Sequence, residues 1–274
     1  MAHKILNTPG GIGQIPAGNV LVGHGYTGNL ATFNGKIFVF DFDNQPDPLN
    51  PLNLPENTIR VKFKSGYTPD MGDTQTRVTS YQDNVWDIYK EDTDWDGLFN
   101  ENDQHYLLGV LGANTKNVTS MKSLFHYCEQ LTTVALFDTS NVTDMTQMFY
   151  NCSSLVTVPL YDTSNVTNMF NMFSWASSLE TVPLFNTSNV ENMDYVFAYC
   201  SSLKYIPLFD TSKMKDVTQC FYHCSKVETG ALALYNQMIS QANPPTKFDC
   251  CFTYCGSNTQ TGSAELAQIP DDWK

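Results

Sequence analysis

The sequence predicts an α+β solenoid: a stack of about five to six 24-residue coils, each combining short strands with a helical turn, preceded by an N-terminal β-rich anchor and cap. Two observations lead to this fold class. An acidic or amide residue recurs every 24 residues, at Asn114, Asp138, Asp162, Asn186 and Asp210. Apolar residues recur in the same phase, so neighbouring units can bury faces that a single unit would leave exposed.

The composition limits what this protein can bind. The chain has 274 residues and a formal net charge of −13, with no basic cluster, so nucleic acid is not an expected partner. No segment is long and apolar enough to insert into a bilayer. The N-terminal segment shows neither the apolar core of a signal peptide nor a cysteine placed for lipidation, so we expect no standard export signal.

The chain before the repeats divides into an anchor and a cap. Residues 1–55 form the predicted anchor segment, which ends in a proline-rich linker. Residues 56–104 are predicted to cap the first coil, because a bare end would expose apolar surface and strand edges. Within this cap, Ile59, Val61 and Phe63 alternate with charged residues, a pattern that predicts a half-buried strand.

Residues 105–274 contain the predicted coils and a C-terminal cap. In one unit, "SSLETVPLF" indicates a short strand, "NTS" a turn and "DYVFAYC" a helical turn, because its apolar residues are spaced as on one helix face. The stretch "VETGALALYNQMISQANPP" predicts the longest helix, ended by two prolines. Together with the last coil, this helix should close the C-terminal end.

The recurring apolar residues predict a continuous core. Phenylalanines recur in one column, namely Phe125, Phe149, Phe173, Phe197, Phe221 and Phe252. A second column holds Cys128, Cys152, Ala176, Cys200 and Cys224. A position that accepts Cys or Ala needs a small buried side chain, so reduced, packed cysteines are expected, with disulfides as the alternative.

The repeat also carries a family resemblance. "TSNVTDMTQMFYNCSSLVTVPL" resembles the repeat of BspA-type leucine-rich-repeat bacterial surface proteins, in the variant found in mycoplasma surface lipoproteins. The resemblance covers roughly the last 160 residues. It implies a leucine-rich-repeat-like solenoid in a surface-exposed or secreted protein of binding or adhesion.

A second resemblance suggests where the protein acts. "TIRVKFKSGYTPDMGDTQTRVTSYQDNVWDIYK" and the terminal "AELAQIPDDWK" are similar to proteins of phages and prophages of gut Bacteroidota, including crAss-like phages. The resemblance implies a virion appendage, a head or tail fibre protein for host attachment, that becomes extracellular after lysis. Its implied partners are other virion proteins through the N-terminal segment, a host-surface protein or glycan, and further copies of itself, with a trimer as one option. The alternative is a BspA-type adhesin on a bacterial cell surface.

Aromatic residues just before the cysteine column form the candidate binding site. Helical spacing would turn them away from the core, into a ridge of Tyr127, Tyr150, Trp175, Tyr199, Tyr222 and Tyr254. Aromatic rings exposed in a row suit sugar faces or protein contact. The alternative is that these rings pack on neighbouring coils and only cover the turns.

The acidic loop "DTDWDGLFNEND" is the candidate metal site. Its oxygen-bearing residues at EF-hand-like offsets are Asp92, Asp94, Asp96, Asn100 and Asp103. Calcium is therefore the one cofactor that the sequence suggests, and an exposed acidic turn is the alternative.

Enzymatic chemistry finds little support in the sequence. His126 and His223 are close to Cys128 and Cys224, but thiols in an apolar column stay protonated and inert. The sequence therefore predicts a non-catalytic interaction module. A calcium-binding or enzymatic protein that uses residues 92–103 is the remaining alternative.

Overall fold

The structure is a computed structural model that describes residues 47–70, 76–82 and 84–274. The chain divides into two units, Met1–Asp47 and Pro48–Lys274, and the described helices and strands belong to the second unit. The predicted anchor segment, with its linker up to residue 46, lies outside the described residues.

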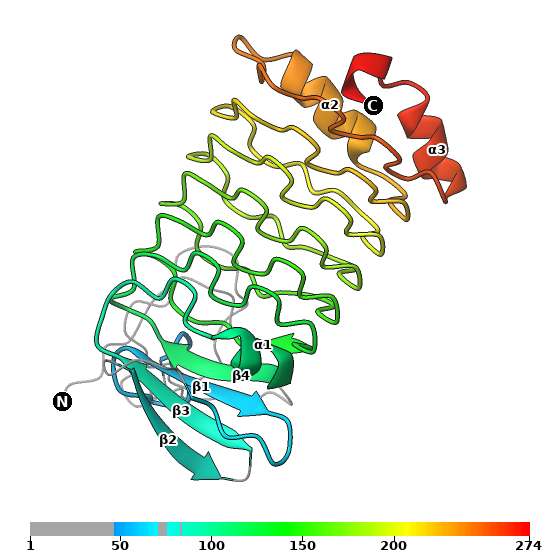
Figure 1. Ribbon diagram of the computed structural model, residues 1–274. Helices are drawn as coiled ribbons and strands as arrows, with labels where there is room; N and C mark the ends of the chain where they lie inside the picture. The colour runs from blue at the N-terminus through cyan, green and yellow to red at the C-terminus, as the bar shows by residue number, and fades with distance from the viewer. Residues whose placement is uncertain (1–46, 71–75, 83) are drawn as a thin grey trace, which may run out of the picture. The chain divides into compact units, whose positions relative to one another are not determined.

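The strands lie at the N-terminal end of the second unit (Figure 1). Among the described residues, they form one mixed sheet of order β2-β3-β1-β4-β5, with β1 (Thr58–Phe63), β2 (Thr76–Gln82), β3 (Val85–Lys90), β4 (Leu107–Asn114) and β5 (Thr133–Val134). β4 and β5 pair in parallel, and the other pairs are antiparallel. The helices are α1 (Glu101–Tyr106), α2 (Ala231–Ile239), α3 (Gln260–Leu266) and the 3-10 helix η1 (Asp271–Trp273).

The alternation expected in β1 is confirmed. Ile59, Val61 and Phe63 are fully buried. Arg60, between them, lies opposite Asp87 of β3 and makes a bidentate ion pair with it, at 2.6 and 2.7 Å. This central strand of the sheet is thus fixed by burial on one face and by a charged cross-strand pair on the other.

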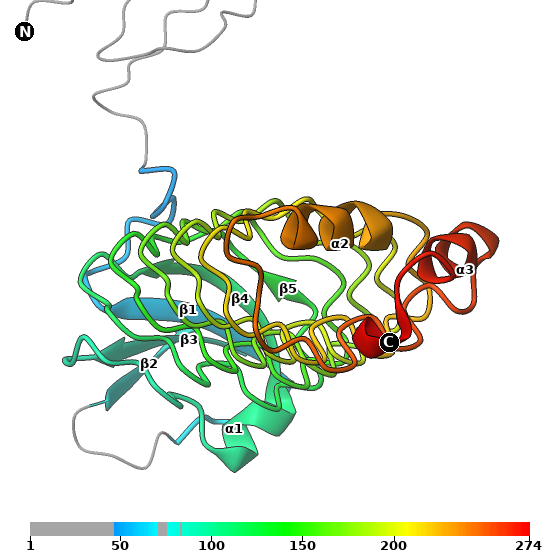
Figure 2. The same cartoon turned by 90° about the horizontal axis from the view of Figure 1, so that it is seen from above.

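Between the sheet and the C-terminal helices, the repeats run side by side (Figures 1 and 2). Isolated parallel bridges join the same position of successive repeats, namely Asp94–Ser120, Ser120–Asp144, Asp144–Asn168, Asn168–Asn192, Asn192–Asp216 and Asp216–Lys247. Neighbouring repeats are therefore held in one register along the chain, with the same backbone position bridged in each.

The predicted fold class, an α+β solenoid whose coils each hold short strands and a helical turn, is wrong. Regular secondary structure in the described residues consists mainly of strands in the single mixed sheet, with three short α-helices. The sheet is neither closed nor curled. The repeats themselves are built from turns, except for the two residues of β5.

The predicted helical turn fails because neighbouring repeats compete for the backbone N–H groups. Val196 N–H donates to Met193 O of its own repeat (3.2 Å), which closes a turn. The next N–H, of Phe197, donates instead to Cys220 O of the following repeat (2.9 Å). This alternation leaves no run of donors for the i to i−4 bonds of an α-helix. Apolar spacing alone does not distinguish the two arrangements.

The strand predicted in "SSLETVPLF" does not form, because this segment lacks one of the backbone N–H groups that would pair with the neighbouring repeat. In the repeat that contains β5, Ala135 N–H donates to Val110 O of β4 (3.0 Å), and β5 forms beside β4. The same position in later repeats is Pro159, Pro183 and Pro207, which carry no N–H. Continuous strand pairing therefore ends at β5, and in the described residues an isolated bridge between Tyr205 and Thr229 recurs at this place.

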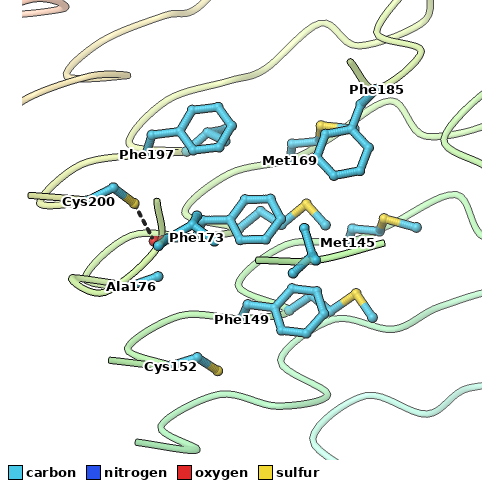
Figure 3. Packing of buried hydrophobic residues seen from close by; sticks show 14 of the residues in the cluster. Met145, Phe149, Cys152, Met169, Phe173, Ala176, Phe185, Phe197 and Cys200 are labelled. Atoms are coloured by element: carbon cyan, nitrogen blue, oxygen red, sulfur yellow. Dashed lines mark hydrogen bonds between the residues drawn. The ribbon is translucent and has the colours of Figure 1, made fainter. Parts of the chain in front are cut away.

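The core predicted from the apolar columns is confirmed. Seven phenylalanine rings stack on one another at centroid separations of 5.3 to 5.8 Å, the six predicted ones and Phe99 at the N-terminal end. Figure 3 shows three of them, Phe149, Phe173 and Phe197. Leu131, Leu155, Leu179 and Leu203 are also fully buried. Each repeat therefore shares its interior with both neighbours.

The cysteines are reduced, as expected. All eight lie in the described residues, none forms a disulfide, and all but Cys250 are buried. The structure adds a role for the thiol, because Cys200 Sγ donates to Phe173 O (3.1 Å), as Cys152 and Cys224 do to the matching carbonyls of their neighbours (Figure 3). Burial raises the pKa of the Cys200 thiol, so it remains a proton donor.

The C-terminal helices cover the last repeats (Figure 2). The predicted helix is present as α2, which buries Ala231, Leu234 and Met238. In earlier repeats a threonine hydroxyl donates to the next repeat, as from Thr187 to Asp210 O (2.7 Å), whereas Thr211 Oγ1 accepts from Gln237 of α2 (3.0 Å). No helix in the described residues is long and apolar enough to cross a membrane.

Candidate functional site: an aromatic ridge

The predicted aromatic residues lie on successive repeats, in the turn before the cysteine column. Tyr127, Trp175 and Tyr254 are exposed to 42%, 45% and 54%, while Tyr150, Tyr199 and Tyr222 are half-buried. His126 and His223 join them through ring contacts. Together, these eight residues form the aromatic ridge.

The ridge occupies two adjacent columns of the repeat. The first column holds His126, Tyr150, Ser174, Ala198, Tyr222 and Thr253. The second holds Tyr127, Asn151, Trp175, Tyr199, His223 and Tyr254. The six predicted residues therefore do not form a single line, because Tyr150 and Tyr222 belong to the first column and the other four to the second.

Four rings of the second column form a continuous stack. Trp175 and Tyr199 are 3.9 Å apart between centroids and 14° from parallel. Tyr199 also stacks on His223 (5.2 Å, 10°), and His223 contacts Tyr254 (4.5 Å). Both faces of Tyr199 are thus covered, so the rings hold one another in place as well as facing solvent.

A second, smaller group of rings lies nearer the sheet. His126 stacks on Tyr150 (5.0 Å), and Tyr127 meets Tyr150 edge-on (5.4 Å). Burial lowers the pKa of His126, so its ring is neutral at pH 7. In the part of the chain that the structure describes, no ring contact joins this group to Trp175, and Asn151 occupies the intervening position of the second column.

The two histidines were not predicted as part of the site. The sequence drew attention to His126 and His223 only as neighbours of cysteines. The signal that could have found them is their place in the two columns, where they alternate with tyrosine and tryptophan.

The second column has an unusual backbone. All six of its residues have positive φ, between 55° and 66°. Asparagine and glycine adopt this conformation most readily, whereas other L-residues are strained there by roughly 1 kcal/mol. Asn151 fits this preference, as does His223 to a lesser degree, but the tyrosines and Trp175 do not. Backbone preference therefore does not explain why aromatic residues occupy these positions.

The positions beside the second column carry almost no charge. Four residues before it lie Ser123, Gln147, Asn171, Tyr195, Gln219 and Cys250. Two residues after it lie Glu129, Ser153, Ser177, Ser201, Ser225 and Gly256. In a chain with a net charge of −13, this surface is mainly amide and hydroxyl, with Glu129 at one end.

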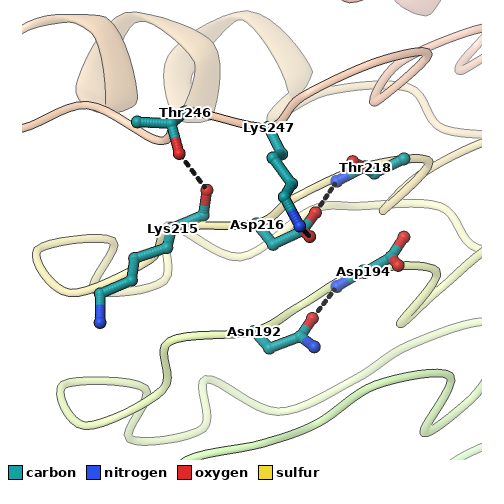
Figure 4. Close-up of polar contacts among 7 residues, drawn as sticks. All are labelled: Asn192, Asp194, Lys215, Asp216, Thr218, Thr246 and Lys247. Carbon is teal, nitrogen blue, oxygen red and sulfur yellow. Dashed lines mark hydrogen bonds and ion pairs between the residues drawn. The ribbon is translucent and has the colours of Figure 1, made fainter.

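One half-buried carboxylate lies among polar side chains of successive repeats (Figure 4). Asp194 Oδ1 is buried and has no hydrogen-bond partner among the described residues. Burial, and then the charge of Asp216, raise the pKa of Asp194 to about 6, an effect that Lys247 partly offsets. Lys247 itself pairs with Asp216 at 3.1 Å. This carboxyl group therefore titrates within the physiological range.

The acidic loop has the hydrogen bonding and register of a repeat. Asp94 Oδ1 accepts from Asp96 N–H (2.8 Å), as Asp144 does from Thr146 N–H in a later repeat. The bridge between Asp94 and Ser120 places the loop in register with the repeats. Gly97, at φ +56°, matches the left-handed position that other repeats fill with non-glycine residues. The loop is thus a degenerate first repeat, offset by 26 residues instead of 24, which its sequence concealed.

The remaining loop residues have other partners. Asn100 caps α1, and the buried Asp103 accepts from Tyr67 Oη (2.7 Å). Asp92 accepts from Asp94 N–H at 3.3 Å. In the described part of the chain, no group of three His, Cys, Asp or Glu side chains could hold a metal ion. Calcium binding stays a prediction, which calorimetric titration with calcium tests.

A different surface carries a row of exposed leucines. Leu136, Leu160, Leu184 and Leu208 occupy one position of four successive repeats, and Leu184 is 59% exposed. The sequence presented Leu184 only as an apolar member of a strand. Nothing in the structure shows what covers this row, and it supplies control positions for the ridge.

These features define a class of protein: a tandem-repeat protein with 24-residue units in register and an aromatic surface along one line of turns. The family described as "Mycoplasma protein of unknown function, DUF285" matches residues 76–157, 93–182 and 119–235, and the chain belongs to this family. This is the BspA-like surface protein family, so the resemblance of the repeat is confirmed at that level. Neither curated proteins nor solved structures yield a match to the chain.

Proposed function

We propose that this protein is a non-catalytic interaction module that attaches to a cell surface through the aromatic ridge. The observation that carries the proposal is the second column, where exposed aromatic side chains occupy strained positive-φ positions. Backbone strain of this kind is concentrated at functional sites in proteins. Exposed Trp and Tyr are also the side chains that contribute most to binding surfaces.

A structural role for the thiols supports the non-catalytic part of this proposal. Burial raises the pKa of Cys128 and Cys224 well above that of a free thiol. A nucleophilic cysteine needs the opposite shift and access to solvent. The nearby histidines also favour a non-catalytic role, because the rings of His126 and His223 stack on neighbouring aromatic rings.

The module belongs, in this proposal, to a phage virion appendage that contacts the host. The similarity of the flanking segments to proteins of gut Bacteroidota phages supports this assignment. Other virion proteins would bind the N-terminal segment, and copies of the chain would associate with one another. A cell-surface adhesin is the second candidate, which the BspA-like family favours.

Mass spectrometry separates the two candidates. Purified virions should contain the protein if it is an appendage, and washed envelopes of uninfected cells should lack it. Abundance in the envelope and absence from virions would replace the first candidate with the second.

Cell attachment tests the role of the ridge. The full chain carrying both Trp175→Ala and Tyr199→Ala should bind host cells at least about tenfold more weakly, because it loses the central pair of the stack. A matched control, Leu184→Ala with Leu208→Ala, removes exposed apolar surface elsewhere and should bind normally. Circular dichroism confirms that both variants are folded. Equal attachment by all three proteins would remove the ridge from the mechanism.

A further inference from the structure

We propose that the free face of Trp175 binds one sugar ring of an uncharged glycan, in the position that Asn151 leaves open in the second column. The inference rests on the proposed function, because it names the ligand class and the place on the ridge where that ligand binds. A sugar ring there would extend the aromatic stack by one member.

The stack ends at Trp175. Tyr199 covers one face of its indole at 3.9 Å, and Tyr199 is the one ring in contact with Trp175 among the described residues. Trp175 nevertheless remains 45% exposed. The next member of the column towards the sheet is Asn151, which has no ring to offer.

The side chain of Asn151 also leans away from Trp175. Its Nδ2 donates to Glu129 Oε1 of the preceding repeat at 2.8 Å. Glu129 thereby holds the amide on the far side, and the same hydrogen bond occupies one oxygen of the only carboxylate in this flanking column. Among the described residues, Trp175 therefore has a ring on one face only, and the neighbouring member of its column is an amide held by Glu129.

The chemistry around this face favours a carbohydrate over a protein. The C–H groups of a pyranose ring carry partial positive charge and suit the electron-rich face of an indole. Sugar hydroxyls need amide and hydroxyl partners, and the flanking columns offer Gln147, Asn171, Ser153 and Ser177. An apolar anchor of a protein partner would need a pocket lined by apolar side chains, which these columns do not supply.

The charge of the chain selects uncharged glycans. With a net charge of −13 and no Lys or Arg in either flanking column, a sialylated or sulfated glycan finds no counter-charge there. Neutral hexose and N-acetylhexosamine units meet no such repulsion.

The experiment begins with the full chain on an array of immobilised neutral, sialylated and sulfated glycans. The neutral glycan that binds best is then titrated by calorimetry, with Trp175 fluorescence as a second readout. Trp95 and Trp273 are buried, and the half-buried Trp86 lies in β3 of the sheet, so the part of the signal that Trp175→Phe removes is assigned to Trp175. We expect binding to the neutral class, together with a fluorescence change that Trp175→Phe abolishes.

Substitutions at two residues, Trp175 and Asn151, test the position independently. Trp175→Ala removes the platform and should weaken binding about tenfold, whereas Trp175→Phe should retain part of it. Asn151→Tyr removes nothing, but it fills the gap with a ring, as Tyr127 and Tyr199 do in their repeats, and should also block binding. Leu184→Ala is the control and should bind as the unchanged chain does.

The outcomes separate this inference from the proposed function. Binding to no neutral glycan, preference for charged glycans, or neutral binding that survives Trp175→Ala and Asn151→Tyr would each overturn it. If cells stripped enzymatically of glycans still bind the chain through the ridge, the partner is a protein; the proposed function stands and the glycan inference falls. If attachment to untreated cells does not depend on the ridge, the proposed function itself fails.

Discussion

Phe173 shows how a single side chain holds this protein together. Its ring lies between Phe149 and Phe197 at 5.4 and 5.5 Å, within 5° of parallel to both. The ring is fully buried, so both neighbouring repeats lose contacts if it is removed. The energetic unit at this scale is therefore the column, to which each repeat contributes one member.

Replacing Phe173 with alanine should cost about 3–5 kcal/mol of unfolding free energy, because the cavity has rings on both sides and cannot collapse easily. Urea denaturation followed by circular dichroism measures the change. Leu184→Ala, at an exposed position, should stay within about 0.5 kcal/mol. Similar losses in the two variants would show that the phenylalanine column is not the core.

Thiol reactivity tests the cysteine column. In the folded protein, only Cys250 is accessible enough to react quickly with a disulfide reagent such as Ellman's, because the other seven cysteines are buried. All eight should react in denaturant. Several fast thiols in the native state, or fewer than eight after unfolding, would contradict the reduced, packed arrangement.

Asp194 gives the protein a predictable pH dependence. Its pKa is raised to about 6 in the folded state, above the reference value of 3.8, so the folded state holds this proton more tightly than the unfolded state does. Stability therefore falls as pH rises from about 4 to about 6, and the penalty is complete above that window.

Asp194→Asn removes this titration. The variant should be more stable than the unchanged chain at pH 7.5, while the two should converge near pH 4. Denaturation curves of both proteins across this range give the difference directly. A difference that does not vary with pH would show that Asp194 has an ordinary pKa.

At the level of structural elements, the turns join neighbouring repeats and also position the aromatic ridge. They alternate bonds within a repeat with bonds to the next, and this alternation requires two left-handed residues in each repeat, such as Tyr195 and Tyr199. The sequence could not reveal these positions, because in the described repeats glycine occupies one of them, Gly97, and tyrosine, glutamine and asparagine occupy most of the others. For the same reason, the helical spacing assumed for the ridge placed Tyr150 and Tyr199 in one line.

The entry to α2 depends on a glycine. Gly230 has φ +108°, and a Cβ there would lie 2.3 Å from Ile206 O of the preceding repeat. Gly230→Ala should therefore destabilise the protein by more than about 1 kcal/mol and loosen α2 from the last repeats. Hydrogen exchange of α2 amides reports the loosening. Asn236→Ala, on the exposed face of the same helix, should leave exchange unchanged, and an equal effect of both would exclude the steric explanation.

For the whole molecule, the period was the most predictable property. The 24-residue phase correctly identified the buried columns, because side chains that meet in every repeat must recur at one interval. The phase did not identify the local conformation, because the same apolar spacing arises from a helical turn and from turns that are hydrogen-bonded to the next repeat. The first repeat escaped notice because Trp95 stands at the position of Met121 and its offset is 26 residues.

Deletion in and out of phase is the most direct test of repeats held together by shared columns. Removing residues 163–186 joins Asp162 to Thr187 and restores every column, so this variant should unfold in one cooperative transition. Removing residues 163–174 takes out half a period, sets aromatic columns against polar ones, and should leave an unfolded or aggregated chain. Thermal unfolding followed by circular dichroism measures both. Equal stability of the two variants, or failure of the in-phase deletion alone, would contradict this arrangement.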